Sequence, residues 1–147
     1  MKGKTCYFIG HRYGDVNIER LVAEIEQHIV EYGVDTFIVG HYGFFDLMAA
    51  HYTREAKEKH PHIKLYRLQP YFPGEREHDE SEYYDGIIYL DGMETVPRRF
   101  AIVQANHRMV DGSDYLIANA WKPGSNSLKL VEYARRKKHI QVTNLVE

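Results

Sequence analysis

Short apolar runs alternate along this chain with longer segments in which apolar residues recur every three or four positions. The short runs predict six strands, over residues 5–10, 36–40, 63–68, 86–90, 115–120 and 140–145. The longer segments predict four helices, over about 18–32, about 43–59, from 97 onward and about 127–138. Strands therefore alternate with helices throughout the chain, apart from one interval without periodicity between residues 71 and 85.

Residues that favour helix ends mark several of these boundaries. Asn17 is a suitable N-cap for the first helix, and Gly33 is a natural C-terminal stop. Pro97 suits the first position of the third helix. That helix carries Phe100, Val103 and Val110 on one apolar face, as expected for a helix that packs against a sheet.

The alternation of elements predicts the fold class. Apolar strands separated by amphipathic helices are typical of a parallel sheet that is covered on both faces. We therefore expect an α/β protein with a three-layer α/β/α, Rossmann-like fold and a mostly parallel sheet of about six strands. The sequence contains no linker, repeat or low-complexity segment, so residues 1–147 are expected to form a single domain. The interval 71–85 contains six acidic residues and is interpreted as an exposed loop.

Three of the predicted strand–helix junctions carry residues suited to binding an anion. They are Gly10-His11-Arg12, the turn from Gly40 to Gly43 followed by Asp46, and Gly124-Ser125-Asn126-Ser127. Glycine lets backbone N–H groups approach a phosphate closely, and the start of a helix offers N–H groups with no intrahelical partner. In a parallel sheet all three junctions open at the carboxyl edge, where such folds bind ligands. The sequence therefore predicts a phosphate-bearing, nucleotide-type ligand at this edge, although no junction is a Walker A motif or a complete G-x-G-x-x-G fingerprint.

Four segments around these junctions resemble the YpsA-like branch of the SLOG superfamily. They are TCYFIGHR at 5–12, GHYGFFDLMAA at 40–50, NHRMVDGSDYLIA at 106–118 and GSNSLKLVEYA at 124–134. The segments follow the order of that branch over nearly the whole chain. The resemblance implies the Rossmann-like fold of the LOG (lysine-decarboxylase-like) phosphoribohydrolases and the DprA/Smf DNA-processing proteins. It also implies binding of nucleotides or their derivatives, with Asn106 at the site.

The chain departs from the LOG enzymes at positions that those enzymes use for catalysis. Ala105 stands where the branch has an arginine, and Lys129 and Leu130 stand where a glutamate follows the LOG turn. Catalytic residues are therefore not assigned. A LOG-like N-glycosidase acting on a nucleotide remains an alternative to ligand binding, with Asp46 and Glu132 as the available acids. A DprA-like, DNA-associated module is a second alternative.

Charge and composition narrow the class of partner. A formal net charge of −2 and a pI near 6.5 give no electrostatic reason to bind nucleic acid or an anionic membrane, so neither partner is expected. No apolar run approaches the roughly 20 residues of a membrane-spanning helix. The start of the sequence has no signal-peptide pattern. Cys6 is the only cysteine, which favours a reducing compartment, and we expect the protein to be cytoplasmic.

The sequence contains no recognisable metal-ligand motif, so we expect no metal site and no resident cofactor. Nine histidines are present, but they form no H-E-x-x-H motif and no Cys/His ligand set. Twelve tyrosines are compatible with a homo-oligomer as well as with a ligand site. The residues predicted to bind the ligand are Gly10, His11, Arg12, Gly40, Gly43, Asp46, Asn106, Gly124, Ser125, Asn126 and Ser127.

Overall fold

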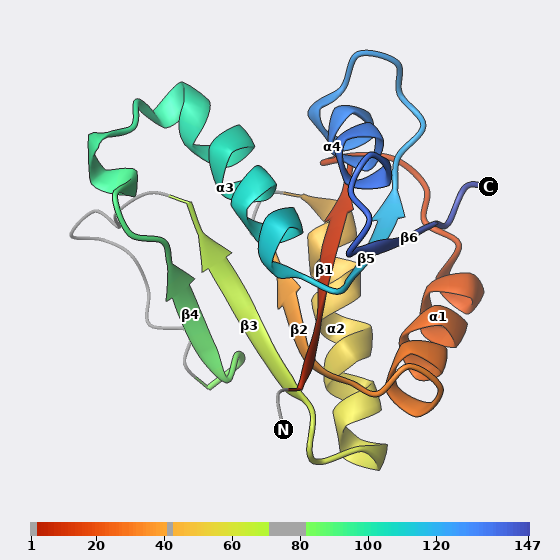
Figure 1. Cartoon of the computed structure of the whole chain (residues 1–147). Helices are drawn as coiled ribbons and strands as arrows, with labels where there is room; N and C mark the ends of the chain where they lie inside the picture. The colour runs from red at the N-terminus through yellow and green to blue at the C-terminus, as the bar shows by residue number, and fades with distance from the viewer. Residues whose placement is uncertain (1–2, 41–42, 71–81) are drawn as a thin grey trace.

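Six strands form one parallel sheet in this computed structural model, which describes residues 3–40, 43–70 and 82–147. The strands are β1 (Lys4–Gly10), β2 (Val34–Val39), β3 (Lys64–Gln69), β4 (Gly86–Tyr89), β5 (Tyr115–Asn119) and β6 (Gln141–Asn144). Their order across the sheet is β4-β3-β2-β1-β5-β6 (Figure 1). Every neighbouring pair is parallel, so all six carboxyl ends lie at the same edge.

Four α-helices cover the two faces of the sheet. They are α1 (Ile18–Val30), α2 (Phe44–Lys59), α3 (Arg98–Gly112) and α4 (Asn126–Arg135), and a short 3₁₀ helix, η1 (Met93–Thr95), precedes α3. Buried residues of α1 and α2 share one hydrophobic cluster with the sheet, and those of α3 and α4 share a second cluster. The predicted three-layer, Rossmann-like α/β fold is therefore confirmed.

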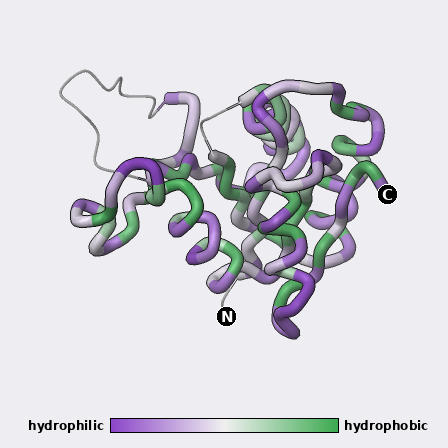
Figure 2. Tube along the Cα trace, turned by 90° about the horizontal axis from the view of Figure 1, so that it is seen from above, coloured by the Kyte–Doolittle hydropathy of each residue, from purple (hydrophilic) through white to green (hydrophobic). Residues whose placement is uncertain are grey.

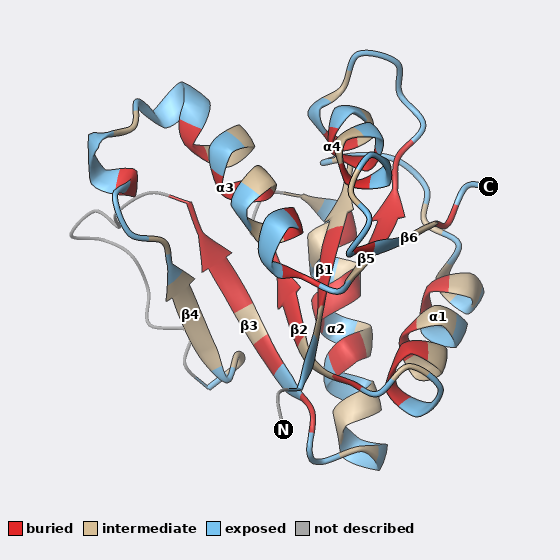
Figure 3. Cartoon of the chain, in the orientation of Figure 1, coloured by how far each residue is buried: buried red, intermediate tan, exposed pale blue. Residues whose placement is uncertain are grey.

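The centre of the sheet is its most buried part. Buried residues run along β1, β2, β3 and β5, whereas the edge strand β4 is mostly half-buried (Figure 3). The helices alternate between hydrophobic and hydrophilic residues, as expected when one side of each helix faces the sheet (Figure 2). Within the described ranges, no helix is long and apolar enough to cross a membrane.

The strand order changes direction between β1 and β5. From β1 the chain adds β2, β3 and β4 on one side, and it then returns to place β5 and β6 on the other side. The helices that follow β1 and β5 lie on opposite faces, because α1 belongs to one hydrophobic cluster and α4 to the other. Such a topological switch point is where open parallel sheets bind ligands.

The predicted boundaries agree with the structure to within a few residues. Asn17 caps α1 as predicted, since its side chain accepts a hydrogen bond from the Arg20 N–H. Gly33 follows α1 with a φ of 72°, a left-handed conformation that favours glycine. The last helix, α4, ends at Arg135, three residues before its predicted end. Most of the predicted acidic loop, residues 71–81, lies outside the described residues.

α3 packs through a different face from the one predicted. Ala101, Ala105 and Val110 are fully buried, while Phe100 is 53% exposed and Val103 is half-buried. Successive helix residues are rotated by roughly 100° from one another, so a stripe through 101 and 105 turns Phe100 away from the sheet. The small alanine side chains let α3 lie close to β1, with which it is in contact. Of the three residues predicted to share one apolar face, Val110 is fully buried, whereas Phe100 is not.

His28 is a fully buried titratable group on α1. Its Nδ1 donates a hydrogen bond to the Glu24 carbonyl oxygen at 2.6 Å, and its ring lies edge-on to Tyr32 and Tyr115. Nε2 is buried and has no hydrogen-bond partner among the described residues. Burial lowers the pKa of His28 below its usual value of 6.5, and this effect outweighs the opposing hydrogen bond to Glu24.

This burial makes the fold sensitive to mild acid. Because the pKa of His28 is lowered in the folded state, the unfolded chain binds the proton more tightly. The stabilising contribution of neutral His28 is complete above pH 6.5 and decreases as the pH falls toward the lowered folded-state value. The His28→Phe variant, which fills the same space, should cost about 1 kcal/mol at pH 8 through loss of the hydrogen bond. Urea titrations from pH 8 to pH 5 measure the free energy of unfolding of both proteins. The difference between the wild type and the variant should shrink as the pH falls, and a difference that stays constant would contradict the assignment.

Candidate ligand-binding site

A cleft of about 140 Å³ lies at the carboxyl edge of the sheet, beside the switch point. It brings together residues from all three predicted junctions and from α3. The predicted ligand-binding residues that line it are Gly10, Arg12, Gly40, Asp46, Asn106, Asn126 and Ser127. The other described residues that line it are Tyr7, Ile9, Leu68, Pro70 and Ile102. The first two come from β1 and the last from α3, and none of the five was predicted.

The loop after β1 lies directly against the start of α2. The Phe44 N–H donates a hydrogen bond to the Arg12 carbonyl oxygen at 2.8 Å. A Cβ at Gly43 would lie 2.3 Å from the Arg12 Cα, so only glycine permits this approach. Gly10 is equally confined, because a Cβ there would lie 2.4 Å from the Phe45 ring. These contacts fix the backbone from which the Arg12 side chain extends to the cleft.

Asp46 lies in the first turn of α2 and reaches the end of β2. Its Oδ2 lies 2.9 Å from where a Cβ would stand on Gly40. A carboxylate in the first turn of a helix is favoured by the helix dipole. The predicted turn between β2 and α2 also contains His41 and Tyr42, which lie outside the described residues.

Both serine hydroxyls of the third junction hold the fold together. The Ser125 side chain is the N-cap of α4 and accepts a hydrogen bond from the Leu128 N–H at 3.1 Å. The Ser127 hydroxyl, which is 7% exposed, donates to the Gly10 carbonyl oxygen at 2.9 Å. Gly124 adopts a φ of 77° in the exposed turn before the helix and does not line the cleft. What this junction offers a ligand is therefore the Asn126 side chain and the first-turn N–H groups of α4.

His11 joins the loop after β1 to the loop after β5. Its Nε2 accepts hydrogen bonds from the Trp121 N–H at 3.1 Å and the Lys122 N–H at 3.3 Å. The His11 and Trp121 rings meet edge-on, with centroids 4.1 Å apart. Desolvation, followed by the charge of Lys122, lowers the pKa of His11. The neutral ring is thus used to hold two loops together and, unlike Arg12, does not line the cleft.

Asn106 is 5% exposed and lies at the inner wall of the cleft. Its Oδ1 accepts a hydrogen bond from the Tyr7 hydroxyl at 2.5 Å. Its Nδ2 has no acceptor among the residues that the structure describes, so the amide has N–H donors available to a ligand. The sequence pattern places Tyr7 only in a strand, although a buried tyrosine hydroxyl usually requires a partner and so indicates a polar neighbour.

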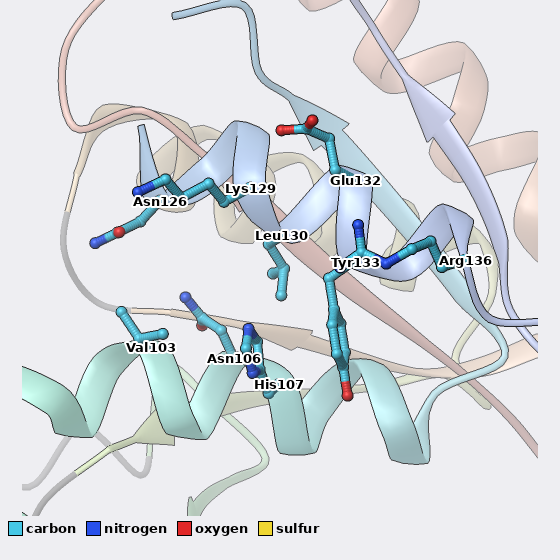
Figure 4. A pocket seen from close by; sticks show the side chains of 9 residues that line it. All are labelled: Val103, Asn106, His107, Asn126, Lys129, Leu130, Glu132, Tyr133 and Arg136. Atoms are coloured by element: carbon cyan, nitrogen blue, oxygen red, sulfur yellow. The ribbon is translucent and has the colours of Figure 1, made fainter. Parts of the chain in front are cut away.

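A second hollow, the α3–α4 groove, adjoins the cleft. It has a volume of about 340 Å³ and is lined by Val103, Asn106 and His107 of α3 and by Asn126, Lys129, Leu130, Glu132, Tyr133 and Arg136 (Figure 4). The His107 and Tyr133 rings are stacked, with centroids 4.2 Å apart and planes 6° apart. The groove and the cleft share Asn106 and Asn126. Of the groove residues, only these two were predicted to bind a ligand.

Among the described residues that line the cleft, Arg12 is the one cation and Asp46 the one carboxylate. Within residues 3–40, 43–70 and 82–147, no three His, Cys, Asp or Glu side chains are grouped so that they could hold a metal ion. Burial raises the pKa of the Cys6 thiol far above its usual range, so this thiol is not a nucleophile at neutral pH. The arrangement is therefore suited to holding an anion and a polar neutral group together.

Comparison with known proteins identifies the fold but no close relative. Neither a family model nor a curated protein sequence matches the chain. DNA processing protein A (DprA) from Streptococcus pneumoniae aligns with 95% of the chain at 15% identity, with a TM-score of 0.66. DprA from Helicobacter pylori aligns with 95% of the chain at 13% identity, with a TM-score of 0.61. The chain spans only 50% and 65% of these two proteins.

Molybdenum cofactor proteins share the fold as well. The molybdenum cofactor binding protein from Rippkaea orientalis aligns with 99% of the chain at 16% identity, with a TM-score of 0.62 and 80% of its own length covered. At such low identities these similarities concern the fold alone. The YpsA-like branch therefore stays a prediction from the sequence motifs. The chain has the Rossmann-like fold that those motifs predicted, and membership of the SLOG superfamily stays a prediction from the motifs as well.

Proposed function

We propose that the cleft binds a phosphate-bearing nucleotide or nucleotide derivative. The observation that carries this proposal is the convergence of Arg12, Asp46 and the first turn of α4 on one cleft at the switch point of the sheet. A cation and a helix N-terminus suit a phosphate group, and a carboxylate suits the hydroxyl groups of a sugar. The proposal concerns binding and requires no chemical turnover.

The phosphate is assigned to the start of α4. Asn126 and Ser127 occupy the first turn of this helix, where backbone N–H groups lack intrahelical acceptors and the helix dipole favours an anion. Arg12 faces the same cleft from the loop after β1. The Ser127 hydroxyl already donates its hydrogen bond to the Gly10 carbonyl oxygen. We therefore expect the backbone N–H groups, rather than this side chain, to contact the phosphate.

Fold neighbours support a role in binding a small molecule. Two of them are described as a molybdenum cofactor binding protein and, in Chlamydomonas reinhardtii, a molybdenum cofactor carrier protein. The second aligns with 96% of the chain at 16% identity, with a TM-score of 0.55. These proteins indicate that the fold can hold a small ligand. They do not specify the ligand of this chain.

The Arg12→Gln variant tests the phosphate assignment. Loss of one charge-assisted hydrogen bond costs about 1.5–3 kcal/mol, so affinity for ribose 5-phosphate and AMP should fall at least about tenfold. Arg12 is exposed, so the melting temperature without ligand should change little. Thermal-shift titration followed by calorimetry measures both quantities. The control is Lys138→Gln, an exposed cation beyond the opposite end of α4; an equal loss of affinity in both variants would point to a general charge effect.

The Asp46→Asn variant tests the sugar assignment. The change keeps the shape of the side chain but removes the charge that strengthens hydrogen bonds to hydroxyl groups. Affinity for ribose 5-phosphate should fall about tenfold, while affinity for inorganic phosphate should change less than twofold. Calorimetric titrations with the two ligands make the comparison. Equal weakening of both would place Asp46 at the phosphate or in the structural support of the cleft.

Single-stranded DNA is a second candidate ligand, because one fold neighbour, DprA from Helicobacter pylori, is described as binding it. The carboxyl edge carries exposed aromatic rings at Tyr13 and Trp121, which are 80% and 43% exposed, and cations at Arg12 and Lys122. Aromatic rings and cations together are typical of surfaces that bind single strands. Fluorescence anisotropy of a labelled oligonucleotide, with and without competing AMP, distinguishes this candidate from nucleotide binding.

A further inference from the structure

We propose that the α3–α4 groove receives a planar nitrogen heterocycle, the base of the ligand whose phosphate lies in the cleft. This inference rests on the proposed function and specifies the part of the ligand that the cleft alone does not hold. The cleft measures about 140 Å³, below the roughly 300–1,000 Å³ typical of small-molecule sites. The adjoining groove measures about 340 Å³ and falls within that range.

The two hollows adjoin each other near the start of α4. Asn126 and Asn106 line both of them. Figure 4 shows Asn126 toward one end of the groove, Asn106 beside His107, and Tyr133 stacked on the His107 ring farther along. A ligand anchored by phosphate at the first turn of α4 can therefore extend between the two helices without crossing the sheet.

The walls of the groove suit a flat ring. Val103 and Leu130 provide apolar surface from α3 and α4, and His107 provides an aromatic face. Tyr133, which backs His107, is itself held in place: its hydroxyl donates to Asp111 Oδ1 at 2.7 Å, and Lys137 Nζ lies 4.6 Å from its ring centroid. The stacked pair is thus a supported platform on which a base can stack, and such stacking is tolerant of base identity.

Polar groups that line the groove can form hydrogen bonds with the edge of that ring. The Asn106 amide is almost fully buried, its oxygen is engaged by Tyr7, and its Nδ2 has no acceptor among the described residues. It is placed to donate to a ring nitrogen or carbonyl oxygen. Lys129, on the opposite helix, is a further donor among the residues that line the groove. Such donors suit the ring nitrogens and carbonyl oxygens of a nitrogen heterocycle better than an aliphatic chain.

The test compares AMP with ribose 5-phosphate, which lacks the base. AMP should bind the wild-type protein at least about tenfold more tightly than ribose 5-phosphate. The His107→Ala variant should weaken AMP binding about tenfold and leave ribose 5-phosphate binding unchanged, and His107→Phe should restore AMP affinity by keeping a stacking face. His107 is half-buried at the surface of the groove, so these variants should fold. Calorimetry gives the affinities, and circular dichroism with thermal melts verifies folding.

The outcomes separate this inference from the proposed function. Failure of the wild type to bind either AMP or ribose 5-phosphate overturns the proposed function itself. Equal affinity for the two ligands, unaffected by His107→Ala, leaves the cleft assignment intact and overturns the groove assignment. Equal weakening of both ligands by His107→Ala also overturns it, because the residue would then act through the fold. Light scattering completes the test: a dimer that His107→Ala dissociates would assign the groove to a second copy of the chain.

Discussion

The hydrogen bond from the Ser127 hydroxyl to the Gly10 carbonyl oxygen joins two elements that the topology would otherwise separate. The chain leaves β1 toward α1 on one face of the sheet and leaves β5 toward α4 on the other. A gap at the carboxyl edge follows from this divergence. By tying the end of β1 to the first turn of α4, Ser127 sets the width of that gap. This contact therefore links two sides of the cleft, since Gly10 and Ser127 both line it.

A second set of contacts holds the loop after β1 from both directions. On the side of β5, His11 accepts two backbone N–H groups of the neighbouring loop. On the side of α2, the Arg12 carbonyl oxygen accepts the Phe44 N–H, and Gly43 permits the close approach. The backbone around Arg12 is thereby fixed before any ligand arrives. Pre-organisation of this kind strengthens binding, because less conformational entropy is lost when the complex forms.

The sequence predicts the fold and the position of the cleft for clear physical reasons. Continuous apolar runs separated by amphipathic helices require a parallel sheet, and parallel strands place every carboxyl end at one edge. The sequence does not show which residues of each junction support the fold and which are available to a ligand. Ser127 and His11 bond to partners more than a hundred residues away, and such pairings depend on packing that periodicity does not reveal. Both residues were predicted to bind the ligand. Ser127 lines the cleft and also supports it, whereas His11 only supports it.

α3 shows the same limit in its packing. Its face toward the sheet is set by Ala101 and Ala105, whose small side chains allow close approach, and not by the larger Phe100. Hydrophobicity alone ranks Phe100 as the better core residue, so the sequence pattern misplaces the face by about one residue. Asn106 was identified through the family resemblance. The structure adds the reason that it reaches the cleft: it follows the alanine that brings the helix onto β1.

The buried pair of Tyr7 and Asn106 is best explained by the proposed ligand site. A hydrogen bond between two buried polar groups contributes little net stability, and apolar side chains of the same shape can replace both partners at almost no cost. The fold therefore does not require a tyrosine hydroxyl and an amide within an otherwise apolar cluster. What the pair does is hold the Asn106 oxygen against β1, which leaves the amide nitrogen on the side of the cavities that the residue lines. A donor fixed in this way, where the cleft meets the groove, is suited to selecting a ligand with an acceptor at that point.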